Sequence, residues 1–262
     1  MISVERSALE TATETVTLAG SVATLTIGTG RRFNALARED WRALGIAAAS
    51  LAGVSALRAV VIRGRGGTFC SGSDLREWDG ASAEDISASF AEMEATLQAI
   101  EDLPVPTVAL VDGVATGAGC QLALACDLQL MNRSARIGMP IARLGLLVPA
   151  SFANRMSLRI GPSRTKDLLY GGRLLTASQA GDMGLITSVV PDDDLERALG
   201  ELLAGWKGLS AASMRASKAA VDLGLQPVAE PARRAPQGIV ADPQEFAWRV
   251  SSFLNRKSRA SA

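Results

Sequence analysis

The sequence predicts an α/β protein built around a mainly parallel β-sheet. Three runs of aliphatic and β-branched residues, at 57–62, 107–111 and 128–131, have the continuous apolar character of strands buried on both faces. Helical patterns separate these runs, and this alternation implies right-handed crossovers between parallel strands. The length of 262 residues, with 48% hydrophobic and 21% charged residues, fits one large domain with a substantial core.

The first elements are predicted to be a hairpin and a helix. Alternating segments at 15–18 and 22–27 flank Gly20, which indicates two antiparallel strands. A polar loop follows at 28–34. Apolar residues then recur at helical spacing, which predicts a helix that contains Trp41, Leu44, Ala48 and Leu51.

The middle of the chain continues the alternation of strand and helix. A long amphipathic helix is expected over 86–100, before Pro104 and Pro106 interrupt it. A shorter helix is predicted at 122–126. Helical patterns dominate after about residue 150, apart from a strand over 185–190.

The C-terminal part is predicted to be helical. Acidic residues at 192–194 suit the positive end of a helix that extends to Leu203. Further helices are expected at 210–224 and 244–256, and four prolines predict that the segment 226–243 between them is a broken connection: Pro227, Pro231, Pro236 and Pro243. We therefore divide the single domain into a core, 1–204, and a C-terminal helical region, 205–262.

Composition excludes several kinds of function. Lys and Arg number 27, as do Asp and Glu, so charge gives no reason to expect nucleic acid or a membrane surface as a partner. The absence of histidine excludes Ser-His and Cys-His nucleophiles and histidine metal sites. Cys70, Cys120 and Cys126 form no C-x-x-C pair, so we expect no metal and reduced thiols in the cytoplasm. No signal-peptide pattern or membrane-length apolar run is present.

Two short loops, 69–74 and 117–121, carry the strongest functional signal. Each follows a predicted strand and is rich in small residues, so a ligand can approach its backbone closely. Two such loops can direct two N–H groups at one carbonyl oxygen, which is the geometry of an oxyanion hole. Taken singly, each loop is better explained as a tight strand-to-helix turn, and the functional signal comes from the two together. Neither loop matches a phosphate-binding motif.

The two loops and their flanking segments together resemble the enoyl-CoA hydratase/isomerase, or crotonase, superfamily. The matching segments, in order, are 33–36, 60–64, 68–75, 104–109, 112–127 and 176–191. The resemblance implies a spiral of ββα units with a C-terminal helical region that supports a homotrimer or a dimer of trimers. It also implies an acyl-CoA thioester ligand, with coenzyme A as part of the substrate and no separate cofactor.

The resemblance assigns roles to particular residues. The backbone N–H groups of Ser73 and Ala118 would form the oxyanion hole. Contacts with the CoA ligand would come from Arg31, Arg32, Phe33, Cys70, Ser71, Gly72, Asp74, Leu75, Gly117, Phe253 and Lys257. From the residues alone, helix capping is the preferred interpretation of Asp74, and burial in the core is the preferred interpretation of Cys70.

The sequence departs from the family where hydratases carry two catalytic glutamates. The corresponding positions are Gln121 and Ile141, and a third position used by other members falls on or near Pro149. A neutral amide cannot take a proton from water near pH 7. We therefore predict that hydration is weak or absent. The alternatives are a CoA-thioester decarboxylase or isomerase that does not need these glutamates, a non-catalytic acyl-CoA-binding protein, and a purely structural subunit.

Overall fold

The main sheet confirms the predicted α/β class. A computed structural model describes residues 14–235 and 238–260, and the side chains of 16–235 and 238–256. Six strands lie in the spatial order β1 (Glu14–Ala19), β2 (Val22–Ile27), β3 (Ala59–Gly64), β4 (Thr107–Val111), β6 (Leu128–Asn132) and β9 (Ser188–Val190). The pair β1–β2 is antiparallel, as the hairpin prediction requires, and the other pairs are parallel.

A second, three-stranded sheet was not predicted. It contains β5 (Val114–Thr116), β7 (Arg136–Gly138) and β8 (Leu175–Thr176) in that order. Twice the chain passes from a strand of the large sheet directly into a strand of the small one, from β4 to β5 and from β6 to β7. Strands of two or three residues are too short to show an alternating pattern, so the sequence does not reveal this sheet.

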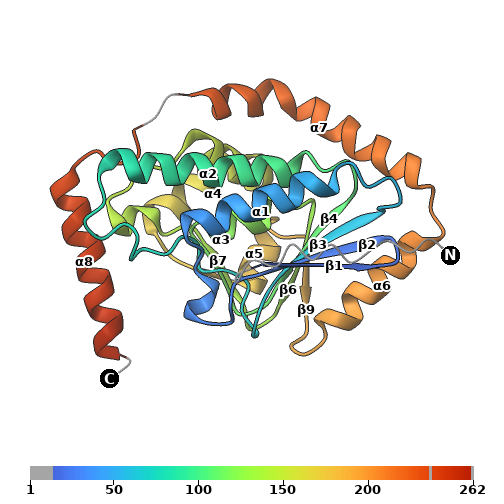
Figure 1. Cartoon of the computed structure of the whole chain (residues 1–262), viewed down its shortest axis with the longest axis horizontal. Coiled ribbons are helices and arrows are strands. Elements are labelled where there is room, and N and C mark those ends of the chain that lie inside the picture. Colours follow the sequence, from blue (N-terminus) through green and yellow to red (C-terminus); the bar gives the residue numbers. More distant parts are fainter. Residues whose placement is uncertain (1–13, 236–237, 261–262) are drawn as a thin grey trace.

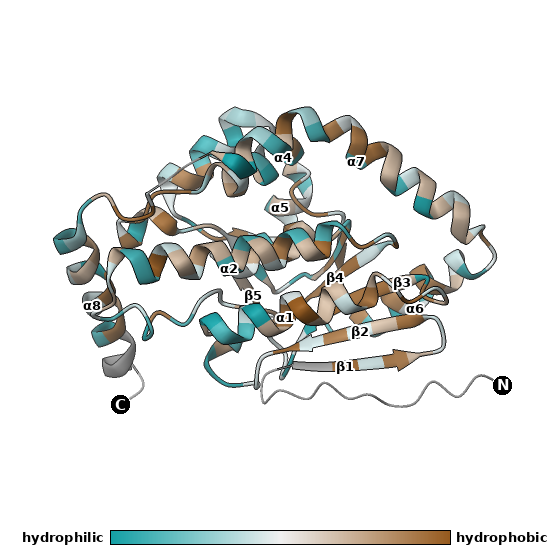
Figure 2. Ribbon diagram, turned by 45° about the horizontal axis from the view of Figure 1, so that its top comes forward, coloured by the Kyte–Doolittle hydropathy of each residue, from teal (hydrophilic) through white to brown (hydrophobic). Residues whose placement is uncertain are grey.

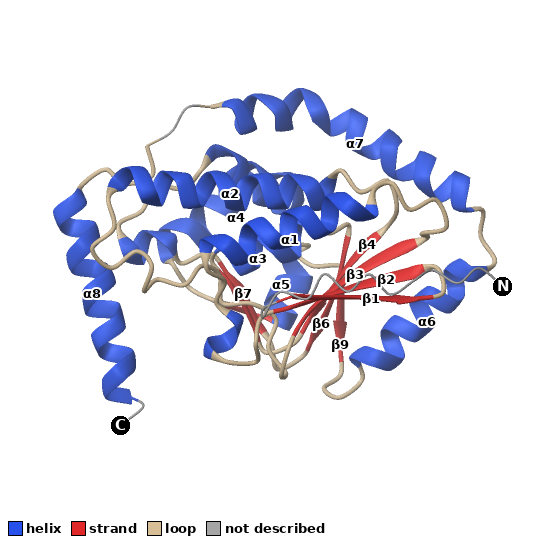
Figure 3. Cartoon of the chain, viewed as in Figure 1, coloured by secondary structure: helices blue, strands red, loops and turns tan. Residues whose placement is uncertain are grey.

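Helices cover both faces of the large sheet (Figure 3). On one face lie α1 (Arg38–Leu51), α2 (Ala83–Glu101) and α3 (Ala118–Ala125), with α4 (Ala150–Gly171) behind them and α5 (Ala177–Met183) before β9 (Figure 1). On the opposite face α6 (Leu195–Lys207) covers a small cluster that includes Val61, Val108 and Leu130. The helix predicted at 122–126 begins earlier, at Ala118, because the first turn of α3 lies within the second loop.

The predicted break at 226–243 is wrong over its first half. Helix α7 (Ala211–Arg234) continues through Pro227 and Pro231. Each proline removes one N–H donor and crowds the carbonyl group four residues earlier. The two prolines are four residues apart and lie on one side of the helix, so the disturbance is confined to that side. An ion pair between Arg233 and Glu101 of α2, 2.7 Å long, holds the last turn. Pro236 lies outside the described residues.

The last helix, α8 (Pro243–Ala260), begins at a proline. Pro243 suits this place because the first turn of a helix needs no N–H from that position. Figure 1 shows α8 at the end of the molecule farthest from the start of α7.

The boundary between the core and the C-terminal helical region, at 204/205, stays a prediction. In the described part of the chain, no helix has both the length and the apolar character to cross a membrane.

Candidate functional site

The two loops lie side by side because consecutive turns of the chain stack at the small sheet. Cys70 forms a parallel bridge with Ala115, the middle residue of β5. Its N–H donates to the Val114 carbonyl oxygen at 2.9 Å, and its carbonyl oxygen accepts from the Thr116 N–H at 3.0 Å. A Cβ atom on Gly119 would lie 2.1 Å from the Cys70 carbonyl oxygen, so this close approach requires glycine.

Two backbone N–H groups, one in each loop, take no part in the hydrogen bonds that join neighbouring segments. The Leu36 N–H donates to Gly72, and the Asp74 N–H donates to Leu36, so the Ser73 N–H takes no part in this bridge. Ala118 is the first residue of α3, where N–H groups have no intrahelical acceptor and the helix end is positive. Gly117 turns the chain into this helix with φ 59°.

A left-handed turn lies against the outer side of the first loop. Arg32, Phe33 and Asn34 have φ angles of 55°, 55° and 53°, a conformation that costs energy for residues other than glycine. The Ser71 N–H donates to the Phe33 carbonyl oxygen at 2.9 Å. Arg31, Arg32 and Phe33 are exposed. The structure thus places these predicted CoA contacts beside the loop and open to solvent.

The side chain of Asn34 holds this strained turn in place. It is buried, and its amide group donates to the carbonyl oxygens of Arg65 at 2.8 Å and Thr68 at 2.7 Å. Its Oδ1 accepts from the Gly30 N–H at 2.8 Å. With a longer bond to the Phe69 carbonyl oxygen at 3.3 Å, four bonds to backbone groups compensate for the left-handed conformation, which sequence reasoning did not predict.

Asp74 is held by arginine side chains. Its carboxylate pairs with Arg76 and lies 3.6 Å from Arg32. It also accepts the Arg76 backbone N–H at 3.2 Å, within a turn over 75–80. No helix begins there, so this bond stabilises a turn and not the helix start that the capping interpretation expected. Partial burial opposes ionisation of Asp74, but the hydrogen bonds and charge of Arg76 and the charge of Arg32 outweigh it and hold its pKa below the usual range. Leu75, the next residue, is half-buried.

All three thiols are buried and free. Cys70 accepts the Gly72 N–H at 3.3 Å and lies 3.3 Å from the Asn34 carbonyl oxygen, so it braces the first loop. Burial raises the pKa of Cys70 and of Cys120 to about 12, and it raises the pKa of Cys126 as well. These groups are packing residues and not nucleophiles.

The cysteines are expected to react with iodoacetamide at pH 8 far more slowly in the folded chain than in the unfolded one. A pKa of about 12 leaves roughly one thiolate in 10⁴ thiols at this pH. Mass spectrometry of samples quenched with and without denaturant measures the difference. Rapid modification of Cys70 in the folded protein would contradict the prediction.

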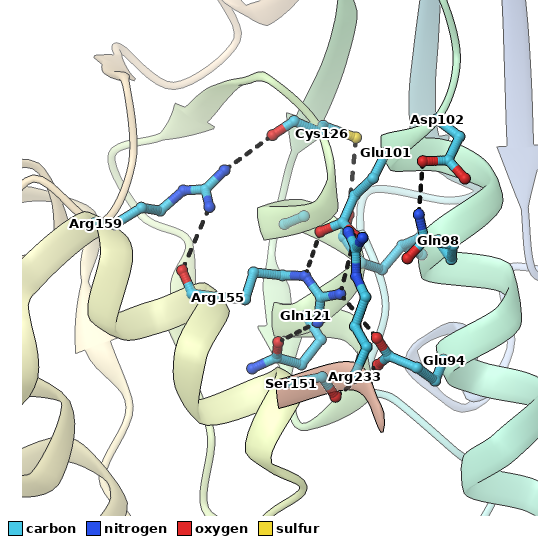
Figure 4. A network of polar contacts seen from close by, with 12 residues as sticks. Glu94, Gln98, Glu101, Asp102, Gln121, Cys126, Ser151, Arg155, Arg159 and Arg233 are labelled. Atoms are coloured by element: carbon cyan, nitrogen blue, oxygen red, sulfur yellow. Dashed lines mark hydrogen bonds and ion pairs between the residues drawn. The ribbon is translucent and has the colours of Figure 1, made fainter. Parts of the chain in front are cut away.

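Gln121 belongs to a buried polar network (Figure 4). Its Oε1 accepts from Nη1 of Arg155 at 3.1 Å, and both residues are buried. Arg155 also pairs with Glu101 at 2.6 Å and Glu94 at 3.3 Å, both from α2. Ser151 donates to Glu94 at 3.0 Å. The guanidinium of Arg155 therefore links α2, α3 and α4 beside the second loop.

Sequence reasoning missed the charged members of this network. Glu94 and Glu101 are seven residues apart at the edge of the apolar stripe of α2, and Arg155 interrupts an apolar stripe on α4. A charge on an apolar stripe needs a partner, and this signal was available. Burial opposes the ionisation of Glu101, but Arg155 and Arg233 outweigh it and hold its pKa below the usual range.

One atom of this network has no partner among the described residues. Nε2 of Gln121 is buried, and no protein group there accepts its hydrogen bonds. Leaving such a donor unpaired costs about 1–3 kcal/mol. Figure 4 shows this nitrogen on the side of the amide that faces away from Arg155.

The remaining predicted residues lie on other elements. Ile141 begins a short 3-10 turn, Ile141–Leu144, and is buried. Phe253 is half-buried on α8, on the same face as Phe246, seven residues earlier, whose ring lies 6.4 Å from that of Trp78. The side chain of Lys257 lies outside the described residues. The contact of Phe253 and Lys257 with CoA and the place of Ile141 at a family glutamate position stay predictions.

The sequence pattern of the enoyl-CoA hydratase/isomerase family matches residues 17–249. The chain belongs to this family. An enoyl-CoA isomerase/hydratase of Mycosarcoma maydis is 35% identical over 168 residues, which cover 64% of this chain and 61% of the relative. The chain therefore spans less than two thirds of that relative's length.

Solved structures extend the similarity over nearly the whole fold of this family member. An enoyl-CoA hydratase from Mycobacterium avium subsp. paratuberculosis has a TM-score of 0.84 at 25% identity, covering 94% of this chain and 97% of that one. A Thermobifida fusca protein solved with acetoacetyl-CoA has a TM-score of 0.74 at 27% identity, covering 96% of each chain. The crotonase fold predicted from the two loops is confirmed.

Proposed function

We propose that the protein binds an acyl-CoA thioester with the carbonyl oxygen between the N–H groups of Ser73 and Ala118. The observation that carries the proposal is the stacking of the two loops, which leaves these two donors out of the bridge and the helix ladder. The positive end of α3 favours an oxygen that gains negative charge. The acetoacetyl-CoA held by the Thermobifida fusca protein is a ligand of the same class and supports the proposal.

The nucleotide end of CoA is proposed to meet the left-handed turn and the C-terminal helix. Arg31 and Arg32 are exposed next to the first loop, and guanidinium groups suit phosphate oxygens. Phe253 and Lys257 would approach from α8. Calorimetry with acyl-CoA of several chain lengths tests the proposal, and no binding at high micromolar concentration would contradict it.

Classical hydration is expected to be weak or absent. Gln121 is neutral, Ile141 has no polar side-chain atom, and the segment 138–158 contains no acid. General acid–base catalysis contributes typically about 10²–10⁴-fold, and both groups that would supply it are missing. We expect crotonyl-CoA hydration well below about 10 s⁻¹, measured by the loss of enoyl thioester absorbance.

The matched gain-of-function variant is the double substitution Gln121→Glu, Ile141→Glu. We expect it to raise the hydration rate, because it restores both carboxylates beside the proposed hole. The single substitution Ile141→Gln adds a polar group of similar size without a base and serves as the control. Wild-type hydration at about 10 s⁻¹ or faster would contradict the assignment of these positions.

A reaction without added water is the second candidate function. The oxyanion hole stabilises an enolate, and decarboxylation delivers the electron pair of the broken C–C bond to that enolate while CO₂ leaves. The neutral Gln121 favours this candidate because no protein base is needed for the bond to break. Incubation with a malonyl-type thioester distinguishes a decarboxylase, which releases CO₂, from a protein that only binds acyl-CoA.

We further propose a homotrimer or a dimer of trimers in the cytoplasm. None of the residues of α7 is buried, and Figure 2 shows apolar residues along this helix. Among them, Val221, Leu223 and Val228 are 63%, 65% and 53% exposed, as expected for a surface that a second copy covers. Light scattering coupled to size exclusion measures the mass.

A further inference from the structure

The orientation of the Gln121 amide is determined by its neighbour. Arg155 carries only donors, so the group that faces it must be the oxygen of the amide. The nitrogen then has to point away from Arg155 and away from the two glutamates on α2. If the oxygen and nitrogen of the amide could be interchanged, the amide would not show which kind of ligand atom it can bind. Here the charged donor Arg155 fixes the position of both atoms.

Gln121, which carries the free nitrogen, lies on the same face of α3 as the proposed donor Ala118. Gln121 lies three residues after Ala118 on α3, so both lie on one face of the helix and about 4.5 Å apart along its axis. Helical side chains lean toward the N-terminus, so Gln121 covers the turn that begins at Ala118. A carboxylate at this position would accept hydrogen bonds, whereas the amide nitrogen can only donate.

We propose that Nε2 of Gln121 donates a hydrogen bond to an oxygen on C3 of the acyl group, so that the preferred ligands are 3-oxoacyl-CoA thioesters. A ligand held at Ala118 by its thioester oxygen places its next acyl carbons beside this nitrogen. An oxygen on C3 satisfies the buried donor, and a saturated chain leaves it unpaired. Arg155 acts as a positioning residue that holds the amide in the donating orientation.

This inference rests on the proposed thioester binding and names its substrate class. Calorimetry of the full chain with acetoacetyl-CoA and butyryl-CoA, which differ only in the C3 oxygen, provides the test. We expect acetoacetyl-CoA to bind about fivefold to tenfold more tightly, the effect of one buried hydrogen bond. In Gln121→Met the ratio of the two dissociation constants should fall to about one.

Two further variants keep the test decisive. Gln121→Glu keeps the shape and the contact with Arg155 but replaces the donor by an acceptor, so the preference should be lost there as well. Gln98→Met removes a half-buried amide on α2 that bonds Asp102 at 2.6 Å, and it should leave the preference intact. A preference that survives both substitutions at Gln121 would overturn the proposal.

Malonyl-CoA tests whether the preferred oxygen on C3 belongs to a ketone or to a carboxylate, because its C3 is a carboxylate carbon. A preference for malonyl-CoA without one for acetoacetyl-CoA would overturn the assignment of a ketone. Equal binding of acetoacetyl-CoA and butyryl-CoA by the wild type would overturn this inference and leave thioester binding standing. Failure of every thioester to bind would overturn the proposed function itself.

Discussion

Replacement of Gly72 by alanine is expected to weaken thioester binding strongly. A Cβ atom there would lie 3.0 Å from the Ala118 nitrogen and 2.9 Å from the Thr116 carbonyl oxygen. The two loops would have to separate, which displaces one of the two proposed donors. Loss of one such donor costs about 10²–10³-fold in kcat in enzymes with this kind of site. For binding of the uncharged thioester we expect the loss of at least one hydrogen bond, so that acyl-CoA affinity falls by about tenfold or more, as measured by calorimetry.

The control for Gly72→Ala is Gly67→Ala in the same connection. Gly67 also has positive φ, 71° against 94° for Gly72, so alanine strains the backbone at both places. A Cβ atom on Gly67 would come no closer than 3.7 Å, to Oδ2 of Asp112. We expect Gly67→Ala to lower the melting temperature but to keep the affinity. Equal loss of affinity in both variants would mean that strain, and not the hole, explains the result.

Replacement of Arg155 by methionine is expected to have the largest effect on stability. The guanidinium is 5% exposed and contacts two carboxylates and the Gln121 amide. Removal of one partner from a buried ion pair costs about 3–5 kcal/mol, because the other charge stays buried. Chemical denaturation measures the free energy of unfolding. Arg173→Met, which removes an exposed pair with Asp167, is the control and should change little.

The pH dependence of the Arg155→Met variant follows from the sign of the Glu101 shift. In the wild type, the pKa of Glu101 is lower in the folded chain than its ordinary value of about 4.3. The stability that Glu101 contributes is therefore present above about pH 4.3 and is lost as the pH falls through the folded value. Without Arg155, only Arg233 still opposes the effect of burial on Glu101, so this pKa rises.

The stability deficit of Arg155→Met is consequently expected to be largest near neutral pH and to shrink on acidification. The double variant Arg155→Met, Glu101→Gln should recover part of the loss at pH 7, because it removes a carboxylate that has lost the more deeply buried of its two arginine partners. A deficit that stays constant between pH 7 and pH 4 would show that lost packing, and not the carboxylate, explains the effect.

The same arginine would connect stability to the ligand preference proposed above. It holds Gln121 through one nitrogen and Glu101 through others, and Arg233 of α7 contacts that same Glu101. Hydratases of this family are expected to have a carboxylate at the position of Gln121. In the proposed site, a neutral amide held by a buried cation would stand in place of that base and offer a hydrogen-bond donor.

Local patterns in the sequence determined much of this protein. The strands at 57–62 and 107–111, the helix at 86–100 and the two small-residue loops follow from periodicity and composition, which act over neighbouring residues. The order of the motifs around Gly72 and Gly119 sufficed to predict the family. The prediction that Gln121 and Ile141 stand where hydratases carry carboxylates also needs no coordinates.

Only the tertiary structure determined what surrounds those positions. The small sheet consists of strands too short to leave a pattern, yet it brings Cys70 beside Ala115 and so joins the two loops. The prolines of α7 did not break the helix, because a contact between residues 132 positions apart, Arg233 and Glu101, holds its last turn. The orientation of the Gln121 amide depends on Arg155 from another helix. The direction of the Gln121 donor and the partners of the buried Arg155 charge are determined by groups that are distant in the chain. Local sequence therefore cannot determine them.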